Sequence, residues 1–468
     1  MAVIAGFMVP HPPLIIPEIG KGQEGGIRET TEAYEKAAAE IAALKPETIV
    51  VISPHSVMYA DYFHVSPGKE AAGDFRQFRA GKVALQAEYD EAFVSCLCRE
   101  AQEADFPLGI LGEREKRLDH GVMVPLYFVN KYLQGCRLVR IGLSGLSQAE
   151  HYRAGMLIEK AAVRLGRRTV VIASGDLSHR LKEDGSYGYR EEGPAYDREI
   201  MRTMGNAAFG ELLDYPESFC EKAGECGHRS FTMMAGCLDG KAVKAEKLSY
   251  QGPFGVGYGI CTFHVTGEEK GRRFLEQYIL KNRQDIQSRK EKEDSYVRLA
   301  RKSLETFVRT GRAYVPSREE KEALPREMTG HRAGVFVSVH KEGMLRGCIG
   351  TIAPVTGSVA EEILRNAVSA GTEDPRFPPV GKEELEALVY SVDVLGEPEP
   401  VVSAAQLDAK RYGVIVTRGR KRGLLLPDLE GVDSVEEQIA IARRKAGIGE
   451  EDPVTLERFE VIRHGEKG

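Results

Sequence analysis

The chain has 468 residues, of which 42% are hydrophobic and 29% are charged, and this length predicts two or three domains with ample material for buried cores. Its 64 basic and 70 acidic residues are mixed along the chain, so the net charge of -6 gives no electrostatic case for nucleic-acid binding. No apolar run approaches the roughly 18 to 20 residues of a membrane span, and the opening MAVIAGFMVPHPP lacks a basic n-region and a cleavage site. We therefore expect a cytoplasmic protein that acts on a small molecule and binds neither nucleic acid nor a membrane.

The first half of the chain alternates short runs rich in valine and isoleucine with longer stretches at helical spacing. This pattern predicts an α/β fold with a mostly parallel sheet covered by helices. Between the first two predicted strands, the Ala/Glu/Lys-rich residues 28–44 predict a helix that Lys45 and Pro46 stop, which completes a βαβ unit. The predicted strands are residues 2–9, 48–52, 138–143 and 169–173.

The composition changes at residues 267–294, where many charges surround a few apolar residues, and we interpret this stretch as a solvated helical connector. Beyond it, residues 296–310 predict an amphipathic helix. The chain is thus expected to hold an α/β domain over residues 1–266 and a smaller α+β domain over residues 295–468. Strands of the second domain are predicted at residues 334–339, 387–394 and 413–416.

Three histidines come soon after predicted strands: His11 after AVIAGFMVP, His55 after TIVVISP, and His179 after TVVIASGDLS. The carboxyl ends of parallel strands form one edge of a sheet, where loops converge and ligands bind. A fourth candidate, His120, lies in the sequence LDHG and is expected on a loop or at a helix start. Neutral imidazole is the commonest metal ligand and the usual general base near neutral pH. A single loop histidine is more often a surface or capping residue, but three that follow strands favour a functional site.

A third metal ligand is expected from the sequence GECGHRS, which offers Glu225, Cys226 and His228 within four positions. Two histidines and a carboxylate with open coordination positions form the site of non-haem Fe(II) oxygenases. A cysteine in place of the carboxylate favours a softer metal or a closed site. The residues alone leave Glu225 and Cys226 as alternatives.

The motifs MVPHPPLIIPE, VISPHS, LDHG and SGDLSH, in this order, resemble the LigB-type class III extradiol dioxygenases, whose fold is shared with the Memo proteins. The resemblance covers roughly residues 1–265 and ends in PFGVGYGICTFHV, which is similar to the family's closing strand. It implies that His11 and His55 bind iron and that His120 and His179 are catalytic or supporting histidines. Asp176 would be the neighbour of these two.

The resemblance implies Fe(II) as the cofactor, because the dioxygenases complete their site with a glutamate. The sequence GECGHRS is more similar to the Cys-Gly element of Memo proteins, and Zn or Cu is the alternative if Cys226 is the third ligand. Fe(II) with open positions can bind a catecholate and O2 side by side while a nearby histidine carries the proton. The expected function is thus that of an Fe(II)-dependent, oxygenase-like protein with a small, aromatic or other, substrate.

The same residues allow three alternatives to an oxygenase in the first domain. A Memo-like metal-binding or scaffold protein without oxygenase activity is favoured by the sequence CGHR. A zinc hydrolase is disfavoured because the chain has no HExxH motif. A dinucleotide enzyme is disfavoured because GVGYG precedes a strand instead of opening a helix.

In the second half, MLRGCIGT and TEDPRFPP resemble the AMMECR family, for which no biochemical activity is established. The first motif predicts a short strand whose glycines let another backbone or a ligand come close. In one interpretation Arg346 pairs with Asp374 or Glu373 and Cys348 is a small buried hydrophobe. In the other, Arg346, Cys348, Asp374 and Arg376 form a pocket in which the arginines lower the pKa of the thiol.

The combination of the two resemblances is similar to AmmeMemoRadiSam systems, in which a radical SAM protein accompanies an AMMECR domain and a Memo- or LigB-like protein. The chain has no CxxxCxxC motif, and its eight cysteines show no paired framework. A radical SAM component would therefore be a separate partner. The resemblance also allows a homodimer, because relatives of this fold often pair.

Overall fold

The computed structural model describes residues 2–112, 117–429 and 431–465. The chain divides into two compact units, Met1–Ile279 and Leu280–Gly468. The division falls within α9 (Phe274–Lys292), a helix in the stretch expected as a charged connector. The first residues of that stretch continue a strand of the first unit, which ends at Glu268.

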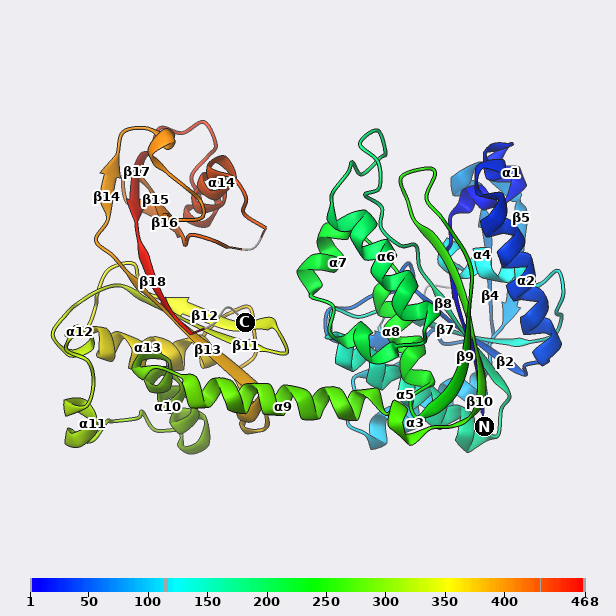
Figure 1. The fold of residues 1–468 in the computed structure, drawn as a ribbon, viewed down its shortest axis with the longest axis horizontal. Coiled ribbons are helices and arrows are strands. Elements are labelled where there is room, and N and C mark those ends of the chain that lie inside the picture. The colour runs from blue at the N-terminus through cyan, green and yellow to red at the C-terminus, as the bar shows by residue number, and fades with distance from the viewer. Residues whose placement is uncertain (1, 113–116, 430, 466–468) are drawn as a thin grey trace. The chain divides into compact units, whose positions relative to one another are not determined.

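A six-stranded sheet in the order β7-β2-β8-β1-β10-β9 forms the centre of the first unit (Figure 1). The first four strands in this order are parallel, whereas β10 runs antiparallel to both β1 and β9. The prediction of a mostly parallel sheet is therefore confirmed, and β8 lies between β1 and β2 at its centre. The strands are β1 (Val3–Val9), β2 (Thr48–Ser53), β7 (Arg137–Gly142), β8 (Thr169–Ser174), β9 (Lys241–Gln251) and β10 (Tyr258–Glu268).

Helices cover both faces of this sheet, so alternate residues of the central strands enter two separate cores. In β2, Ile49 and Val51 pack with the helices of one face, and Val50 and Ile52 pack with those of the other. One face carries α2 (Arg28–Leu44) and α4 (His120–Val129). The other carries α3 (Glu91–Glu103), α5 (Gln148–Leu165), α6 (Glu192–Gly205) and α8 (His228–Cys237).

Smaller elements complete the first unit. A hairpin of β4 and β5 turns through η3 and lies beside α4. Two short strands, β3 and β6, pair in parallel. Two short helices, η4 and α7, precede α8 in the chain. The bounds of all these elements are β3 (Phe63–His64), β4 (Glu70–Phe75), η3 (Arg76–Phe78), β5 (Ala80–Glu88), β6 (Leu108–Gly109), η4 (Phe209–Leu213) and α7 (Glu217–Ala223).

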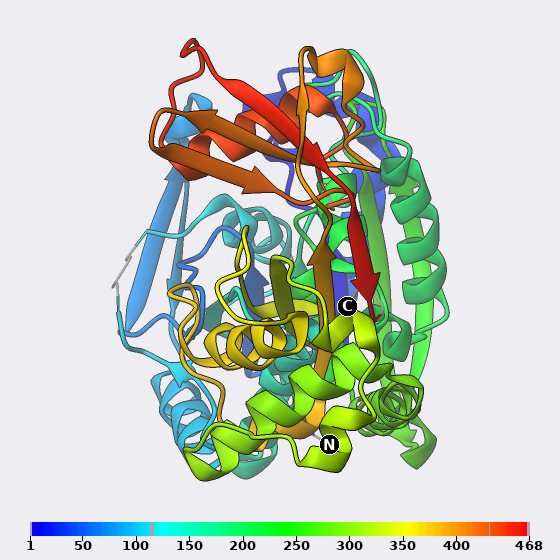
Figure 2. The ribbon, with the colours of Figure 1, turned by 90° about the vertical axis from the view of Figure 1, so that its left-hand side faces the viewer.

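The second unit contains two four-stranded sheets in the orders β12-β11-β13-β18 and β14-β17-β15-β16. All their strand pairs are antiparallel, and β17 and β18 are separated by a single residue, so one extended segment passes from sheet to sheet (Figure 2). The strands are β11 (Val335–Lys341), β12 (Met344–Gly350), β13 (Leu388–Leu395), β14 (Glu399–Val401), β15 (Gly413–Arg418), β16 (Lys421–Leu425), β17 (Thr455–Phe459) and β18 (Val461–His464).

Helices α10 (Ser295–Thr310) and α13 (Val359–Thr372) pack on one face of the first of these sheets. Helix α14 (Val435–Ala446) packs on the second sheet. The expectation of a smaller α+β domain is thus confirmed. Within the described ranges, no helix is both long enough and apolar enough to cross a membrane.

Helices α5 and α8 approach each other so closely that both contribute glycine at their crossing. A Cβ atom on Gly155 would lie 1.9 Å from the carbonyl oxygen of Met233, and one on Gly236 would lie 1.9 Å from that of Tyr152. Because the opposing atoms belong to helix backbones, neither neighbour can rotate away. This crossing fixes the position of α8 and, with it, the turn that precedes the helix.

We expect Gly155→Ala to lower the free energy of unfolding of the first unit by about 3 kcal/mol, because the added methyl group forces the two helices apart. The melting temperature should fall by roughly 5 to 10 °C in a calorimetric scan. Gly205→Ala is the matched control, since a Cβ atom there meets no atom closer than 3.8 Å. Equal melting temperatures for the two variants would contradict the close-packed crossing.

Candidate metal centre

Three potential ligand atoms from separate segments meet at the carboxyl edge of the parallel strands. His11 follows β1, His55 follows β2, and Cys226 lies in the turn before α8. Their ligand atoms all lie within 4.8 Å of one another. The Nε2 atom of His11 is 3.0 Å from Nε2 of His55 and 3.6 Å from Sγ of Cys226.

The two separations measured from His11 match metal bonds to His11, His55 and Cys226. Bonds of about 2.1 Å to nitrogen and 2.3 Å to sulfur produce the observed N–N and N–S distances when the angles at the ion are about 90° and 110°. Such angles lie in the range between octahedral and tetrahedral coordination. His55 is exposed while His11 is buried, so the cluster is open on the side of His55.

His11 is held in place by two hydrogen bonds that leave its Nε2 atom directed at the cluster. Its Nδ1 lies 2.9 Å from Oγ of Ser174, the last residue of β8. Its backbone N–H donates to Oδ1 of Asp176 at 2.8 Å. Burial, and next the charge of His55, lower the pKa of His11 well below its usual value. The ring is therefore neutral at pH 7, as a metal ligand must be.

Cys226 makes hydrogen bonds to the turn after β8 through both its backbone N–H and its sulfur. Its N–H donates to the carbonyl oxygen of Asp176 at 3.3 Å, and the N–H of Asp176 donates to Sγ at 3.3 Å. The turn after β8 and the turn before α8 touch at Gly175 and Gly227. Only glycine fits at this contact, because a Cβ atom on Gly175 would lie 2.1 Å from Cα of Gly227. Burial raises the pKa of the Cys226 thiol well above its usual value. A metal ion must therefore displace a proton from this thiol.

Glu225, the alternative third ligand, takes a different role. Its Oε2 accepts a hydrogen bond of 2.6 Å from the backbone N–H of His228, the first residue of α8. Burial raises the pKa of this carboxyl group to about 7. The imidazole of His228 lies 3.0 Å from the carbonyl oxygen of Leu212 and 3.2 Å from the hydroxyl of Tyr196. Both side chains thus stabilise the start of α8, and Cys226 is the residue that joins the two histidines.

His120 and His179 border the cluster. The ring of His120 lies 4.0 Å from that of His55 and 5.3 Å from that of His11, measured between centroids. Burial, reinforced by the two neighbouring histidines, lowers the pKa of His120 to about 3. Burial also lowers the pKa of His179, whose Nε2 is buried and has no hydrogen-bond partner among the described residues. Both imidazoles are neutral at pH 7.

Asp176 completes this group, because its carboxylate lies beside the histidines on the turn after β8. Burial raises the pKa of Asp176 to about 6, against the opposing effects of the His11 N–H, His179 and His55. The charge of Asp176 in turn raises the pKa of His179, although burial outweighs that effect. An ionised Asp176 therefore stabilises a proton on His179.

Comparison with known proteins identifies both parts of the chain. Residues 5–261 match the family model described as the catalytic LigB subunit of aromatic ring-opening dioxygenase, and residues 297–464 match the AMMECR1 model. A protein of Clostridium acetobutylicum is 43% identical over 473 residues and is covered completely, as is this chain. The chain belongs to the LigB family. It combines a LigB domain with an AMMECR1 domain.

Two further relatives are similar to parts of the chain. A protein of Thermotoga maritima is 51% identical over 174 residues, which is 37% of this chain and 98% of that protein. The crystal structure of an uncharacterised protein from Pyrococcus horikoshii is 32% identical and covers 36% of this chain and 88% of its own, with a TM-score of 0.33.

In the LigB domain, Asp119 is a residue that the sequence interpretation missed. Its carboxylate accepts hydrogen bonds from Oγ of Ser53 at 2.6 Å and Oγ of Ser56 at 2.7 Å, on either side of His55. It also caps α4, whose first residue is His120, by accepting a hydrogen bond from the N–H of Val122. One carboxylate thus positions the segments that carry both His55 and His120. The N-cap could have been inferred from the Asp in LDHG, but the serine partners, more than 60 positions away, could not.

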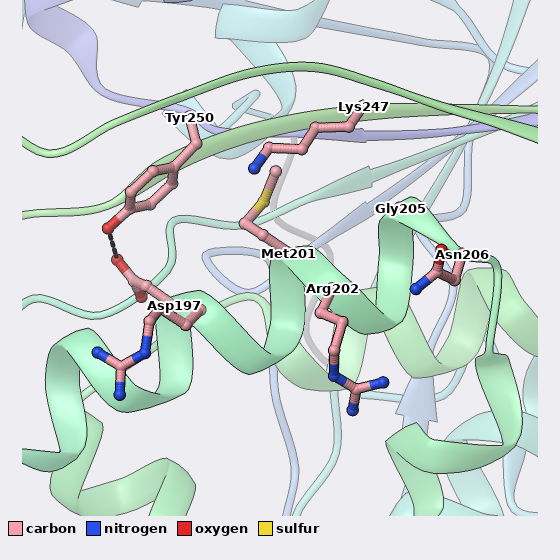
Figure 3. A pocket seen from close by; sticks show the side chains of 8 residues that line it. Asp197, Met201, Arg202, Gly205, Asn206, Lys247 and Tyr250 are labelled. Carbon is pink, nitrogen blue, oxygen red and sulfur yellow. Dashed lines mark hydrogen bonds between the residues drawn. The ribbon is translucent and has the colours of Figure 1, made fainter.

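A surface hollow of about 450 Å³ lies away from the metal cluster, between α6 and β9 (Figure 3). On its wall the hydroxyl of Tyr250 donates to Oδ2 of Asp197 at 2.7 Å. The other oxygen of Asp197 accepts the backbone N–H of Ser178 at 2.8 Å, and Ser178 precedes His179. The hollow is therefore connected to the turn that carries His179, although it contains none of the candidate ligands.

In the AMMECR1 domain, the expected partner of Arg346 was wrong. Its guanidinium binds Glu384, which lies in the 3-10 helix Lys382–Ala387, through Nε at 3.0 Å and Nη2 at 2.9 Å. Asp374 pairs instead with Arg376. The interpretation in which the arginines lower the pKa of Cys348 was also wrong, since burial raises this pKa and outweighs the opposing Ser338 hydrogen bond and Arg376 charge.

The pKa of Cys226 makes metal affinity depend on pH. The thiol is protonated at pH 7 in the metal-free protein, so binding should release one proton and affinity should rise by up to about tenfold per pH unit below the thiol pKa. Burial lowers the pKa values of His11 and His55, so these imidazoles add less to the proton release than the thiol does. Competition with a chelator between about pH 6.5 and 8.5 would measure the slope, and an affinity independent of pH would contradict Cys226 as a ligand.

Proposed function

We propose that the LigB domain binds one Fe(II) ion through His11, His55 and Cys226 and uses it to activate a small molecule on the open side of the cluster. The observation that carries the proposal is the convergence of these three ligand atoms within 4.8 Å. Three protein ligands leave coordination positions free, which is the arrangement of catalytic and not of structural sites. The match to a ring-opening dioxygenase family favours iron and a redox role.

The surrounding residues supply what such a site needs beside the metal. A bound Fe(II) ion would provide a Lewis-acidic, redox-active centre for an anionic substrate and O2. His179 offers an unpartnered Nε2 that can accept the proton of a substrate hydroxyl, and Asp176 stabilises that proton by its charge. His120, whose ring is tilted against that of His55, is neutral at the same edge. These roles would suit proton removal from a phenolic substrate.

A second candidate function is a metal-binding protein without oxygenase activity. The specific observation that favours it is the Cys226 sulfur, because a thiolate ligand prefers softer ions such as Cu(I) and also binds Zn(II) tightly. In that case the metal would be Cu or Zn, and a radical SAM protein acting with the AMMECR1 domain would be the partner to seek. Metal content and oxygen consumption separate the two functions.

The ligand set can be tested by metal analysis after anaerobic purification. We expect His11→Ala, His55→Ala and Cys226→Ala each to lose the bound metal, because each removes one of three protein ligands. Glu225→Gln should retain it, since Glu225 caps α8 through a hydrogen bond that glutamine can also accept. Glu225→Gln is the matched control for Cys226→Ala, because the two positions are adjacent in the same turn. Metal loss in Glu225→Gln with retention in Cys226→Ala would reverse the assignment.

Oxygen consumption tests the iron-dependent activity. We expect the Fe(II)-loaded protein to consume O2 in the presence of a catechol, and His179→Gln to lower the rate about 100-fold or more while the bound iron is unchanged. His264→Gln is the control, because His264 lies outside the cluster and pairs with Glu40 at 3.0 Å. Stoichiometric metal without uptake for any of a panel of catechols would favour the second candidate function.

A further inference from the structure

Two aromatic side chains contact the histidines that border the metal cluster. The ring of Tyr187 lies 5.1 Å from that of His179, and the ring of Phe78 lies 5.5 Å from that of His120, measured between centroids. These distances lie in the range of direct contact between aromatic rings. We call Tyr187 and Phe78 the bordering aromatics.

The bordering aromatics come from separate segments of the LigB domain. Phe78 is the last residue of η3, at the turn of the β4–β5 hairpin, which lies beside α4. His120 is the first residue of the same helix α4. Tyr187 lies in the loop between β8 and α6, which also carries His179. The two aromatic side chains therefore do not form one cluster of their own, because each lies beside a different histidine of the site.

The loop that carries Tyr187 is attached to the rest of the domain at its base. Leu181 and Tyr189 form an antiparallel bridge across the loop. The N–H of Leu181 also donates to the carbonyl oxygen of Gly255 at 3.1 Å, in the turn between β9 and β10. These contacts hold the loop in place, so the position of Tyr187 beside His179 follows from the fold of the loop.

The ring of Tyr187 is open to a ligand. This side chain is 60% exposed, although it contacts an imidazole at the edge of the metal cluster. A planar molecule that covered the ring would remove aromatic surface from water, which is favourable. Tyr189, two positions later, is 49% exposed but makes no ring contact with a histidine in the described part of the chain. The two tyrosines thus differ in their contact with the site more than in their exposure.

Phe78 is fixed more firmly and is connected to the exposed ligand through one imidazole. It is half-buried, and its ring lies 6.3 Å from that of Phe75, which is fully buried. On its other side it meets the ring of His120 edge to face, at 73°. His120 in turn lies 4.0 Å from the ring of His55, the exposed member of the cluster. A ligand bound beside His55 is therefore only one ring away from Phe78.

We propose that Tyr187 and Phe78 are specificity-determining residues of the metal centre, which contact the ring of a bound aromatic anion while its oxygen atoms bind the metal. This inference rests on the function proposed for the LigB domain, because it needs a ligand on the open side of the cluster. The bordering aromatics favour a planar aromatic chelator over an aliphatic one, since the contacts are made to the ring and not to the chelating atoms. Tyr187 contributes more than Phe78, because its ring is more exposed before binding.

Two chelating probes can test this inference by calorimetric titration of the full-length, Fe(II)-loaded protein in the absence of O2. 4-Nitrocatechol has two oxygen donors on a ring, whereas acetohydroxamate has two oxygen donors and no ring. Without O2 no turnover occurs, so the titration measures affinity alone. We expect Tyr187→Ala to weaken the binding of 4-nitrocatechol about tenfold and to leave the affinity for acetohydroxamate and the iron content unchanged.

The conservative variant and the matched control separate the ring contact from a general effect on the loop. Tyr187→Phe should keep the affinity for 4-nitrocatechol, because the ring remains. Tyr189→Ala, which removes a similarly exposed tyrosine from the same loop, should leave both affinities unchanged. Phe78→Leu, which keeps an apolar side chain beside Phe75, should weaken 4-nitrocatechol binding about threefold and leave acetohydroxamate binding unchanged.

The outcomes distinguish this inference from the function on which it rests. If the unaltered protein binds neither probe, the open metal site is absent, and the proposed function is overturned together with this inference. If it binds both probes and Tyr187→Ala keeps the affinity for 4-nitrocatechol, this inference alone is overturned. An equal loss for both probes in Tyr187→Ala, or the same loss in Tyr189→Ala, would also overturn it, because the ring contact would not be the cause.

Discussion

The contact between the turn after β8 and the turn before α8 is the constraint on which the metal centre depends. Histidines that follow parallel strands reach the sheet edge by topology alone, but Cys226 comes from a connection between two helices. It reaches His11 because Gly175 and Gly227 allow the two backbones to touch and because Asp176 exchanges hydrogen bonds with it. The tight crossing of α5 and α8 holds the second turn in place. A side chain at either glycine would separate the thiol from the histidines.

Burial then sets the protonation states of the site. Desolvation lowers the pKa values of His11, His55, His120 and His179 and raises those of Asp176 and Cys226. The imidazoles are therefore unprotonated and free to act as ligands or bases, whereas the thiol keeps its proton until a cation replaces it. The same desolvation makes an ion in this position favourable, since the metal compensates the thiolate charge that the protein alone disfavours.

Burial raises the pKa of both Cys226 and Cys348, but the two thiols have different neighbours. Cys226 has two imidazole neighbours with free nitrogen atoms, which is a ligand set for a metal ion. Cys348 accepts a hydrogen bond from the Ser338 hydroxyl and, among the described residues, has no pair of further ligand groups around it. The chemistry at each cysteine thus follows from the neighbours that the fold supplies and not from the thiol. The two aspartates differ in the same way. Asp119 accepts hydrogen bonds from residues beside the histidines, whereas Asp374 binds the guanidinium of Arg376.

Much of this architecture could be predicted from the sequence, because periodicity and strand-end position act locally. The valine-rich runs predicted the parallel strands, and the positions of His11, His55 and His179 after them predicted one edge of a sheet. The choice between Glu225 and Cys226 could not be made in this way. The two are adjacent in the chain and differ only in which side of the turn each side chain points to, and the start of α8 decides that direction.

The pairing of Arg346 with Glu384 likewise depends on a contact between residues 38 positions apart. The sign of the Cys348 pKa shift depends on how far the fold buries this thiol, which no local motif encodes. Local sequence therefore determined which segments are strands and which chemical groups end them. Long-range packing decided which of those groups meet, because side-chain direction and desolvation arise only when distant segments come together.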